Sequence, residues 1–108
     1  VGHVPTLVFD EVDAGIGGRV AEVVGRKLKA VAARQQVLCV THLPQIAALA
    51  DQHLAVRKRA EGGRTVTTVD LLDVDARAEE IARMLGGETI TATARQHARE
   101  MLKQGLKR

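Results

Sequence analysis

Aromatic side chains are nearly absent from this sequence, which contains one phenylalanine among 108 residues and neither tyrosine nor tryptophan. Its hydrophobic core must therefore be aliphatic. The single cysteine excludes an internal disulfide bond and any zinc site built from several cysteines. No stretch approaches the roughly 20 consecutive apolar residues that cross a bilayer, and no N-terminal signal pattern is seen. These absences favour a cytoplasmic protein.

The length and the charge balance set further limits. A chain of 108 residues makes one small domain or part of one, which buries roughly 60 to 70% of its unfolded surface. Sixteen basic and thirteen acidic residues give a net charge of +3, too small to indicate nucleic-acid binding by itself. Because the sequence starts at Val1 and is almost at once inside a strand, we expect it to be cut from a longer protein.

The most informative segment is a short apolar stretch that ends in two carboxylates. Thr6 to Phe9 has strand character, Asp10 and Glu11 follow it directly, and three glycines lie between residues 15 and 18. Apolar residues hold a strand in a core, so its last positions reach a rim where charge is solvated or meets a metal ion. Such a strand end can present a Mg²⁺ ligand and a general base.

The rest of the chain alternates between helical and strand patterns. Apolar residues from Val20 to Val31 recur at helical spacing and predict an amphipathic helix of about four turns. Gln36 to Val40 is then predicted as a second buried strand, with Cys39 as a buried structural thiol. A helix joining two such strands makes a parallel βαβ unit.

Five further elements are expected after this unit. The first is a helix over Leu43–Ala50 with Pro44 in its first turn, followed by strands Leu54–Arg59 and Arg64–Leu72 joined across Glu61-Gly62-Gly63. A helix from Ala76 to Leu85 comes next, and a last helix carries Ala94, Ala98, Met101 and Leu102 on one face.

Polar residues end both strands of the predicted βαβ unit. Asp10 and Glu11 end the first strand, and Thr41 and His42 end the second. Ligands of parallel sheets bind outside the carboxyl ends of the strands. If the strands are neighbours at about 4.8 Å, or are separated by one strand from elsewhere, side chains from both ends can reach one ligand.

Phosphoryl transfer is a chemistry that uses these residue types together. Mg²⁺ prefers oxygen ligands and keeps several waters, so the Asp10 carboxylate with substrate phosphates makes a sufficient metal site. Glu11 points another way and can orient or deprotonate a water that attacks a γ-phosphate. His42 near that phosphate supplies a hydrogen bond, and the reaction asks mainly for positioning and charge stabilisation.

The residues at these strand ends resemble motifs of the ABC-type ATPases. Leu7 to Glu11 resembles the Walker B strand, Val12 to Gly18 resembles the D-loop, and Thr41-His42 resembles the switch histidine. The longer segments Phe9 to Gly18 and Val40 to Ala47 are similar to those of SMC-like DNA-repair ATPases of bacteria. In that family the two ends of the chain form an ATPase head, with a coiled coil between them. The resemblance covers most of the 108 residues and implies the α/β fold of the C-terminal lobe of an ABC/SMC-type P-loop NTPase head.

The resemblance implies a role for each motif residue. Asp10 would hold Mg²⁺ through water, Glu11 would be the catalytic base, and His42 would sense the γ-phosphate of ATP. Asp13, Gly15 and Gly17 would belong to the D-loop that crosses to a partner head. Many D-loops have an aspartate at the position of Gly17, so any role of that aspartate does not transfer to this chain.

Two other motifs of the family lie outside these 108 residues. A P-loop of the form GxxxxGK[ST] is missing, and so is the Ser-Gly-Gly signature that contacts nucleotide from the opposing head. The resemblance therefore implies an N-terminal half of the head, a second head and DNA as partners, ATP and Mg²⁺ as cofactors, and a nucleoid-associated place in the cytoplasm. The chain alone is expected not to hydrolyse ATP.

Simpler structural roles compete with these assignments. Asp10 and Glu11 can cap the following helix, and His42 can be an N-terminal turn residue of its helix. Arg57-Lys58-Arg59 can contact DNA, but we favour protection of an edge strand. His3, His53 and His97 lack metal-ligand spacing and are expected on the surface or in packing.

Two further classes of function remain beside the ATPase. The first is a metal nuclease in which Asp10, Glu11 and Asp13 bind divalent ions. It would need a carboxylate from another strand end, and the acids at 70, 73 and 75 follow a predicted hairpin instead. The second is an interaction module that keeps the fold without catalysis.

Overall fold

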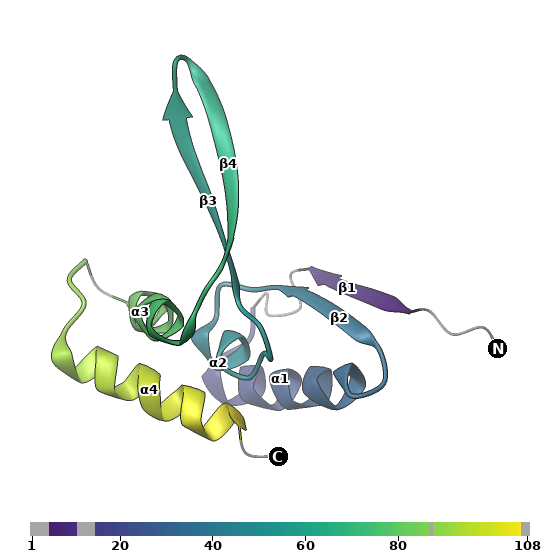
Figure 1. Ribbon diagram of the computed structural model, residues 1–108. Coiled ribbons are helices and arrows are strands. Elements are labelled where there is room, and N and C mark those ends of the chain that lie inside the picture. The colour runs from purple at the N-terminus through teal and green to yellow at the C-terminus, as the bar shows by residue number, and fades with distance from the viewer. Residues whose placement is uncertain (1–4, 11–14, 87, 107–108) are drawn as a thin grey trace.

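The computed structural model describes residues 5–10, 15–86 and 88–106. Within these residues the chain forms two small two-stranded sheets and four helices (Figure 1). In chain order these elements are β1 (Thr6–Asp10), α1 (Gly18–Ala32), β2 (Gln36–Val40), α2 (Pro44–Ala47), β3 (Leu54–Glu61), β4 (Arg64–Leu71), α3 (Val74–Met84) and α4 (Ala92–Leu106). The order confirms the predicted βαβ unit followed by a hairpin and C-terminal helices. None of the helices in the described part of the chain has the length and apolarity that a membrane crossing requires.

Strands β1 and β2 are direct neighbours and run parallel. Their register pairs Thr6 with Gln36 at one end and Asp10 with Val40 at the other. Helix α1 connects them and lies along one face of the pair (Figure 1). This helix repeats apolar residues every three to four positions, so one of its sides packs against the strands and α2 while its charged side faces solvent.

The face of the β1–β2 pair opposite α1 is uncovered, which corrects the prediction of two buried strands. Val8 is 66% exposed, Leu38 44% and Val40 60%. The alternate residues are half-buried, among them Phe9 and Cys39, so Cys39 is not the fully buried thiol that we expected. Successive side chains of a strand point to opposite faces, and in the described chain only one face of this pair is packed.

Helix α2 is shorter than the predicted Leu43–Ala50. It begins at Pro44 after the N-cap residue Leu43, and regular helix ends at Ala47. The backbone N–H of Leu49 then donates to the carbonyl of Ile46 at 3.1 Å, and Ala50 donates to Ala47 at 3.2 Å. These bonds span three residues instead of four, so the helix tightens and stops.

Strands β3 and β4 form the predicted hairpin, which stands away from the helices (Figure 1). Its register pairs Glu61 with Arg64 across a two-residue turn. Gly62 and Gly63 have φ angles of +56° and +78°, which the favoured two-residue hairpin turn requires and which glycine adopts without a steric penalty. β3 continues past the predicted Arg59, because the turn is only two residues long.

The hydrophobic core lies among the helices α2, α3 and α4. Asp73 caps α3 by accepting a hydrogen bond from the backbone N–H of Ala76 at 2.8 Å. The residues buried at the centre are mainly alanines, and they are Ala47, Ala48, Ile81, Ala82 and Ala98. Larger aliphatic side chains surround them, including Leu85, Ile90, Met101 and Leu102. Small central residues let the helices approach closely, and the core is aliphatic, as the lack of aromatic residues led us to expect.

Two glycines permit the closest approaches to α2 and the turn that follows it. A Cβ atom at Gly25 of α1 would lie 2.6 Å from Leu49 Cδ1. A Cβ atom at Gly105 of α4 would lie 2.3 Å from the carbonyl oxygen of Ala48. The end of the Leu49 side chain could move away from a Cβ atom at Gly25, whereas the Ala48 carbonyl is backbone, so α4 lies against this segment in a contact that only glycine permits.

Candidate nucleotide site at the strand ends

The structure brings the two predicted strand ends to one edge of the β1–β2 pair. Asp10 is the last residue of β1 and pairs in register with Val40, the last residue of β2. Thr41 and His42 follow Val40 directly. The strands are direct neighbours, which is one of the two arrangements that the sequence left open, and Asp10 lies at the same end of the pair as Thr41 and His42.

Asp10 is suited to a metal ion that keeps part of its water shell. Its side chain is exposed, and no residue in the described ranges forms a hydrogen bond or ion pair with it. The same ranges contain no group of three or more histidine, cysteine or acidic side chains that could enclose a metal ion. A lone accessible carboxylate fits Mg²⁺, which takes one or two carboxylates and completes its octahedron with water and phosphate oxygens.

His42 lies in a short turn between β2 and α2. The backbone N–H of Leu43 donates to Thr41 Oγ1 at 3.0 Å, which closes the turn around His42. The His42 side chain is exposed, and Pro44, the first residue of α2, is buried. The turn is therefore built by Thr41 and Leu43, with Leu43 as the N-cap of α2.

The loop after β1 lies partly outside the described residues. Glu11 and Asp13, the predicted base and loop acid, fall in the range 11–14 and have no described position. Gly15 has a φ angle of +74°, and Gly17 is the N-cap of α1 without a side-chain cap. Since α1 begins at Gly18 with no acid in its first turn, Asp10 does not cap that helix.

The other acids considered for a nuclease are engaged elsewhere. Asp70 lies in β4, where its Oδ2 atom is 3.3 Å from Arg57 Nη1. Asp73 caps α3. Neither lies at the edge with Asp10, so among the described residues no second strand end brings an acid to that edge.

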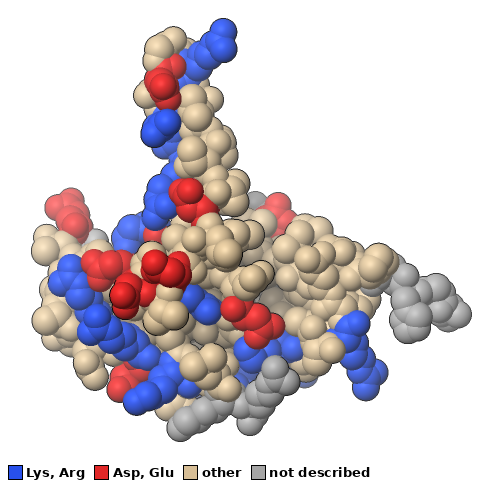
Figure 2. Space-filling model, in the orientation of Figure 1, with Lys and Arg blue, Asp and Glu red and all other residues tan. Residues whose placement is uncertain are grey.

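The basic run of β3 is largely neutralised within the hairpin and by α3. Arg57 pairs with Asp70 and, at 3.7 Å, with Glu80 of α3, while Arg59 pairs with Glu61 at 3.2 Å. Figure 2 shows basic and acidic side chains close together along the hairpin, and a mostly uncharged surface where β1 and β2 lie. This pattern favours the structural role predicted for the run over a DNA contact.

Two predicted packing or surface histidines have described positions. His53 is half-buried between α2 and β3, and burial lowers its pKa, with the charge of Arg77 acting in the same direction and Glu80 opposing both. His97 is exposed on α4 and borders a hollow of about 210 Å³. Both agree with the expected structural placement.

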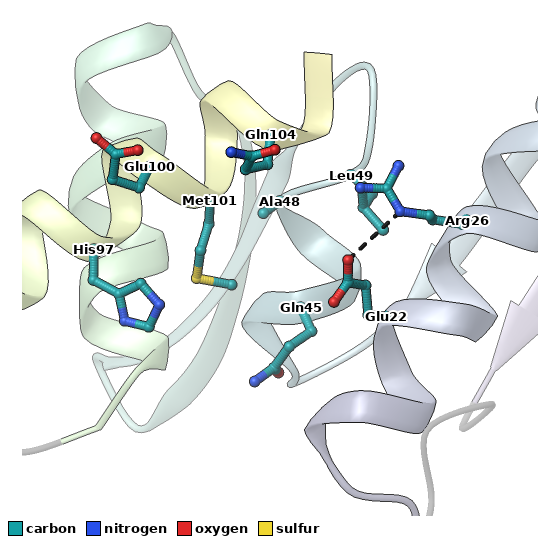
Figure 3. Close-up of a pocket in the computed structure, with 9 residues that line it drawn as sticks. All are labelled: Glu22, Arg26, Gln45, Ala48, Leu49, His97, Glu100, Met101 and Gln104. Carbon is teal, nitrogen blue, oxygen red and sulfur yellow. Dashed lines mark ion pairs between the residues drawn. The ribbon is translucent and has the colours of Figure 1, made fainter. Parts of the chain in front are cut away.

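This hollow lies between α1, α2 and α4 (Figure 3). Met101 points into it from α4, and Glu22 and Arg26 of α1 form an ion pair of 3.6 Å at its rim. Gln45 of α2 also lines it, and the Gln45 Oε1 atom is buried without a partner in the described chain. None of the predicted site residues contributes to this hollow.

Sequence reasoning gave no role to Lys29 and Arg77, although both bind the end of α2. Lys29 Nζ donates to the carbonyl oxygen of Leu49 at 2.8 Å, and Arg77 Nη2 donates to that of Ala47 at 3.0 Å. Burial lowers the pKa of Arg77. The helical spacing of Val20 to Val31 places Lys29 among the charged residues of that helix, and only the fold shows that its side chain is 17% exposed and which carbonyls the two cations meet.

Comparison with known proteins found close relatives for nearly all of the chain. The DNA repair protein RecN of Deinococcus radiodurans is 58% identical over 98 residues, which are 91% of this chain and 17% of the relative. RecN of Xylella fastidiosa, strain Temecula1, is 54% identical and RecN of Bacillus subtilis 46% identical, each over 101 residues, or 94% of this chain and 18% of the relative. The chain thus spans less than a fifth of the length of these curated relatives. No family model matches it.

A solved structure has a fold similar to that of this chain. It comes from work on the structural biochemistry of ATP-driven dimerization and DNA stimulated activation of SMC ATPases. It matches 80% of this chain and 51% of its own with a TM-score of 0.64 at 20% sequence identity. At that identity the likeness bears on the fold alone, and it agrees with the predicted lobe of an SMC-type head.

Proposed function

This chain belongs to the family of RecN DNA repair proteins, and we propose that it forms the C-terminal part of an ATP-hydrolysing, SMC-like head in the complete protein. The observation that carries the proposal is the parallel register of β1 and β2, which places Asp10 and the His42 turn at one edge. The proposed activity is hydrolysis of ATP to ADP and phosphate. Head engagement driven by ATP would control DNA tethering at double-strand breaks.

Each residue at this edge has a different role in the proposed phosphoryl transfer. Asp10 would hold Mg²⁺ through water, and the chemistry that this ion would supply is neutralisation of negative charge on the phosphates of ATP. Glu11 takes a proton from the attacking water, and His42 donates a hydrogen bond to the γ-phosphate. The exposure of Asp10 at the end of β1 supports its role, and the place of His42 in the turn after β2 supports a contact at the same edge.

The loop between β1 and α1 is proposed to contact the second head. Asp13, Gly15 and Gly17 are its candidate contact residues. Gly15 has a positive φ angle, and added Cβ atoms at Gly15 or Gly17 would meet no described atom within 4 Å. The backbone there is open to an approaching partner, which supports a contact made by main-chain groups.

The remainder of the head is proposed to cover the open face of β1–β2. Parallel sheets occur almost only with both faces covered, whereas Val8, Leu38 and Val40 are exposed here. The relatives are more than five times as long as the matched segment, so they contain ample chain to cover it. We propose that this cover is the N-terminal half with the P-loop, and that DNA and a second head are the other partners.

The adjacent acids provide the sharpest test, because they should fail differently. In the complete protein Glu11→Gln should bind ATP with near-normal affinity and hydrolyse it at least about a hundredfold more slowly, since the base is lost and the metal ligand remains. Asp10→Asn should weaken Mg²⁺-dependent nucleotide binding. Binding of a fluorescent ATP analogue, with and without Mg²⁺, and single-turnover hydrolysis separate the two effects.

Glu100→Gln, on the exposed side of α4, is the matched control for loss of one carboxylate. Normal turnover in Glu11→Gln would remove Glu11 from its role. DNA cleavage that depends on metal but not on ATP would support the nuclease instead. The purified 108-residue chain, which lacks the P-loop motif, is expected to show no ATP turnover.

A further inference from the structure

The C-terminal end of α2 is held by two cations that come from different helices. Lys29 Nζ of α1 contacts the carbonyl oxygen of Leu49 at 2.8 Å and Asp51 Oδ1 at 3.2 Å. Arg77 Nη2 of α3 contacts the carbonyl oxygens of Ala47 at 3.0 Å and Ala48 at 3.5 Å, and also that of Ala50. The last carbonyls of a helix have no partner within it, and cations there are stabilising.

Both cations are themselves fixed in place. The Lys29 side chain is only 17% exposed, and Arg77 is half-buried. The backbone N–H of Arg77 bonds to the carbonyl of Asp73 at 2.8 Å, and the Asp73 side chain caps the same helix. A buried cation is retained where acceptors replace its lost water. The carbonyls at the end of α2 supply acceptors for Lys29 Nζ and Arg77 Nη2, whereas Arg77 Nε is buried without a partner among the described residues.

Helix α2 depends on such external support because it is only four residues long. A helix of this length has no stability of its own in water. Its support comes from three sides, through the two cations and through the close backbone approaches at Gly25 and Gly105. The position of α2 is therefore set by α1, α3 and α4.

The fixed end of α2 is connected to His42 by a very short path. Only residues 41–43 separate the last residue of β2 from Pro44, and the hydrogen bond from Leu43 to Thr41 closes that turn. Any shift of α2 must move the turn, since β2 is held by its pairing with β1.

We propose that Lys29 and Arg77 are positioning residues that fix the His42 turn at the nucleotide edge by clamping the C-terminal end of α2. The inference rests on the proposed function, because it gives these two residues a part in the same reaction. They touch neither nucleotide nor metal in this assignment. Their effect is transmitted through α2.

The test is a double-mutant cycle in the complete protein. Arg77→Met and Lys29→Met each remove one cation, and His42→Ala removes the side chain that they are proposed to position. Arg77→Met should lower kcat for ATP hydrolysis about tenfold with little change in KM, because a displacement of about 1 Å is costly in a positioned site. In the His42→Ala background the same substitution should have almost no further effect on kcat.

Two variants sharpen the result. Arg77→Lys should recover part of the activity, since an ammonium group can reach one carbonyl but does not present the planar fork of arginine. Arg95→Met is the matched control, because Arg95 is an exposed arginine of α4 that pairs with Glu79 and does not contact α2. It should leave kcat unchanged.

The possible outcomes are distinct. An equal loss of kcat from Arg77→Met with and without His42 would show that the clamp acts on stability alone and would overturn the proposal. Normal kcat in both Lys29→Met and Arg77→Met would overturn it as well. If Arg77→Met does not fold, Lys29→Met and Arg77→Lys carry the same cycle. Normal turnover in His42→Ala would contradict the role of His42 itself, and with it this inference.

Discussion

Helices α2, α3 and α4 share a buried core, whereas the two sheets leave large apolar side chains exposed. Ile81, Ala82 and Ala98 on α3 and α4 are 0% exposed. In contrast, Val8 in β1 is 66% exposed, and apolar residues at the base of the hairpin such as Leu71 are 62% exposed. The same aliphatic composition therefore gives a closed interior on one side and open apolar surface on the other.

The contrast between the buried helical core and the open β1–β2 pair has a physical reason that bears on the proposed site. Helices satisfy their backbone hydrogen bonds internally and can bury one side against each other within a short chain. Parallel strands need cover on both faces and further strands at their edges. Asp10 and His42 lie at the end of the open β1–β2 pair, and the short turn over residues 41–43 connects that pair to α2, which borders the buried core.

The largest effect on the buried core is expected from Ile81→Ala. The Ile81 side chain is 0% exposed, so its truncation leaves a cavity and should lower the free energy of unfolding by about 2 to 5 kcal/mol. Thermal unfolding of the complete protein measures the loss, and hydrogen exchange locates it in α3 and α4. Val74→Ala, in the same helix but 81% exposed, should change stability by less than about 0.5 kcal/mol. Equal losses of stability in Ile81→Ala and Val74→Ala would show that Ile81 does not lie in a closed core.

A smaller effect is expected where two elements meet at a glycine. Gly105→Ala places a Cβ atom 2.3 Å from the carbonyl oxygen of Ala48, so α4 must move and stability should fall by about 1 to 3 kcal/mol. Gln104→Ala, at the exposed neighbouring position of the same helix, is the control. The comparison uses the melting temperatures of the two variants. An unchanged melting temperature in Gly105→Ala would mean that α4 does not contact the segment after α2 as closely as the structure shows.

A pH-dependent effect is expected at His53, between the two regions. Burial keeps the pKa of His53 in the folded protein below its ordinary value of 6.5. Below that pH the unfolded chain binds a proton at His53 that the folded chain still resists, so stability falls as the pH falls. His53→Gln should therefore make the melting temperature decrease less between pH 7.5 and pH 5.5. His97→Gln, at an exposed histidine, is the control, and identical pH slopes in wild type and His53→Gln would refute the prediction.

The smallest effect is expected at the exposed ion pair between α3 and α4. Arg95 Nε lies 2.8 Å from Glu79 Oε2, and this hydrogen bond lowers the pKa of Glu79. Because the pair is solvated, Arg95→Ala should lower the melting temperature only slightly, and 1 M NaCl should remove the difference. A large decrease that persists in salt would indicate that Arg95 contributes packing.

The sequence predicted the elements well where local patterns are strong. The spacing of valines and leucines located α1, Gly62-Gly63 located the hairpin turn, and the parallel pairing followed from the βαβ pattern. The error in α2 lies at its C-terminal end. Leucine and alanine residues continue a helical pattern to Ala50, but Leu49 and Ala50 donate to carbonyls only three residues back, and the carbonyls of Leu49 and Ala47 also accept from Lys29 and Arg77.

The candidate site could be predicted in part, because local strand patterns identify some of its residues. Asp10 and His42 were identified because each ends an apolar strand, and strand order then placed them at one edge. The burial of Cys39 was overestimated, because the apolar run in β2 gives no sign that the described chain covers only one face. The loop acids Glu11 and Asp13 remain predictions, since they lie outside the described residues.

The sequence by itself determined the aliphatic composition of the core, the order of strands and helices, and the polar residues at the strand ends. These are local properties, set by side-chain periodicity, turn glycines and the absence of aromatic residues and paired cysteines. Only the tertiary structure decided that one face of β1–β2 is open, that α2 ends at Ala47, and that Lys29 and Arg77 meet its carbonyls. Such contacts join residues 20 to 30 positions apart, and no local pattern specifies which groups will meet across that distance.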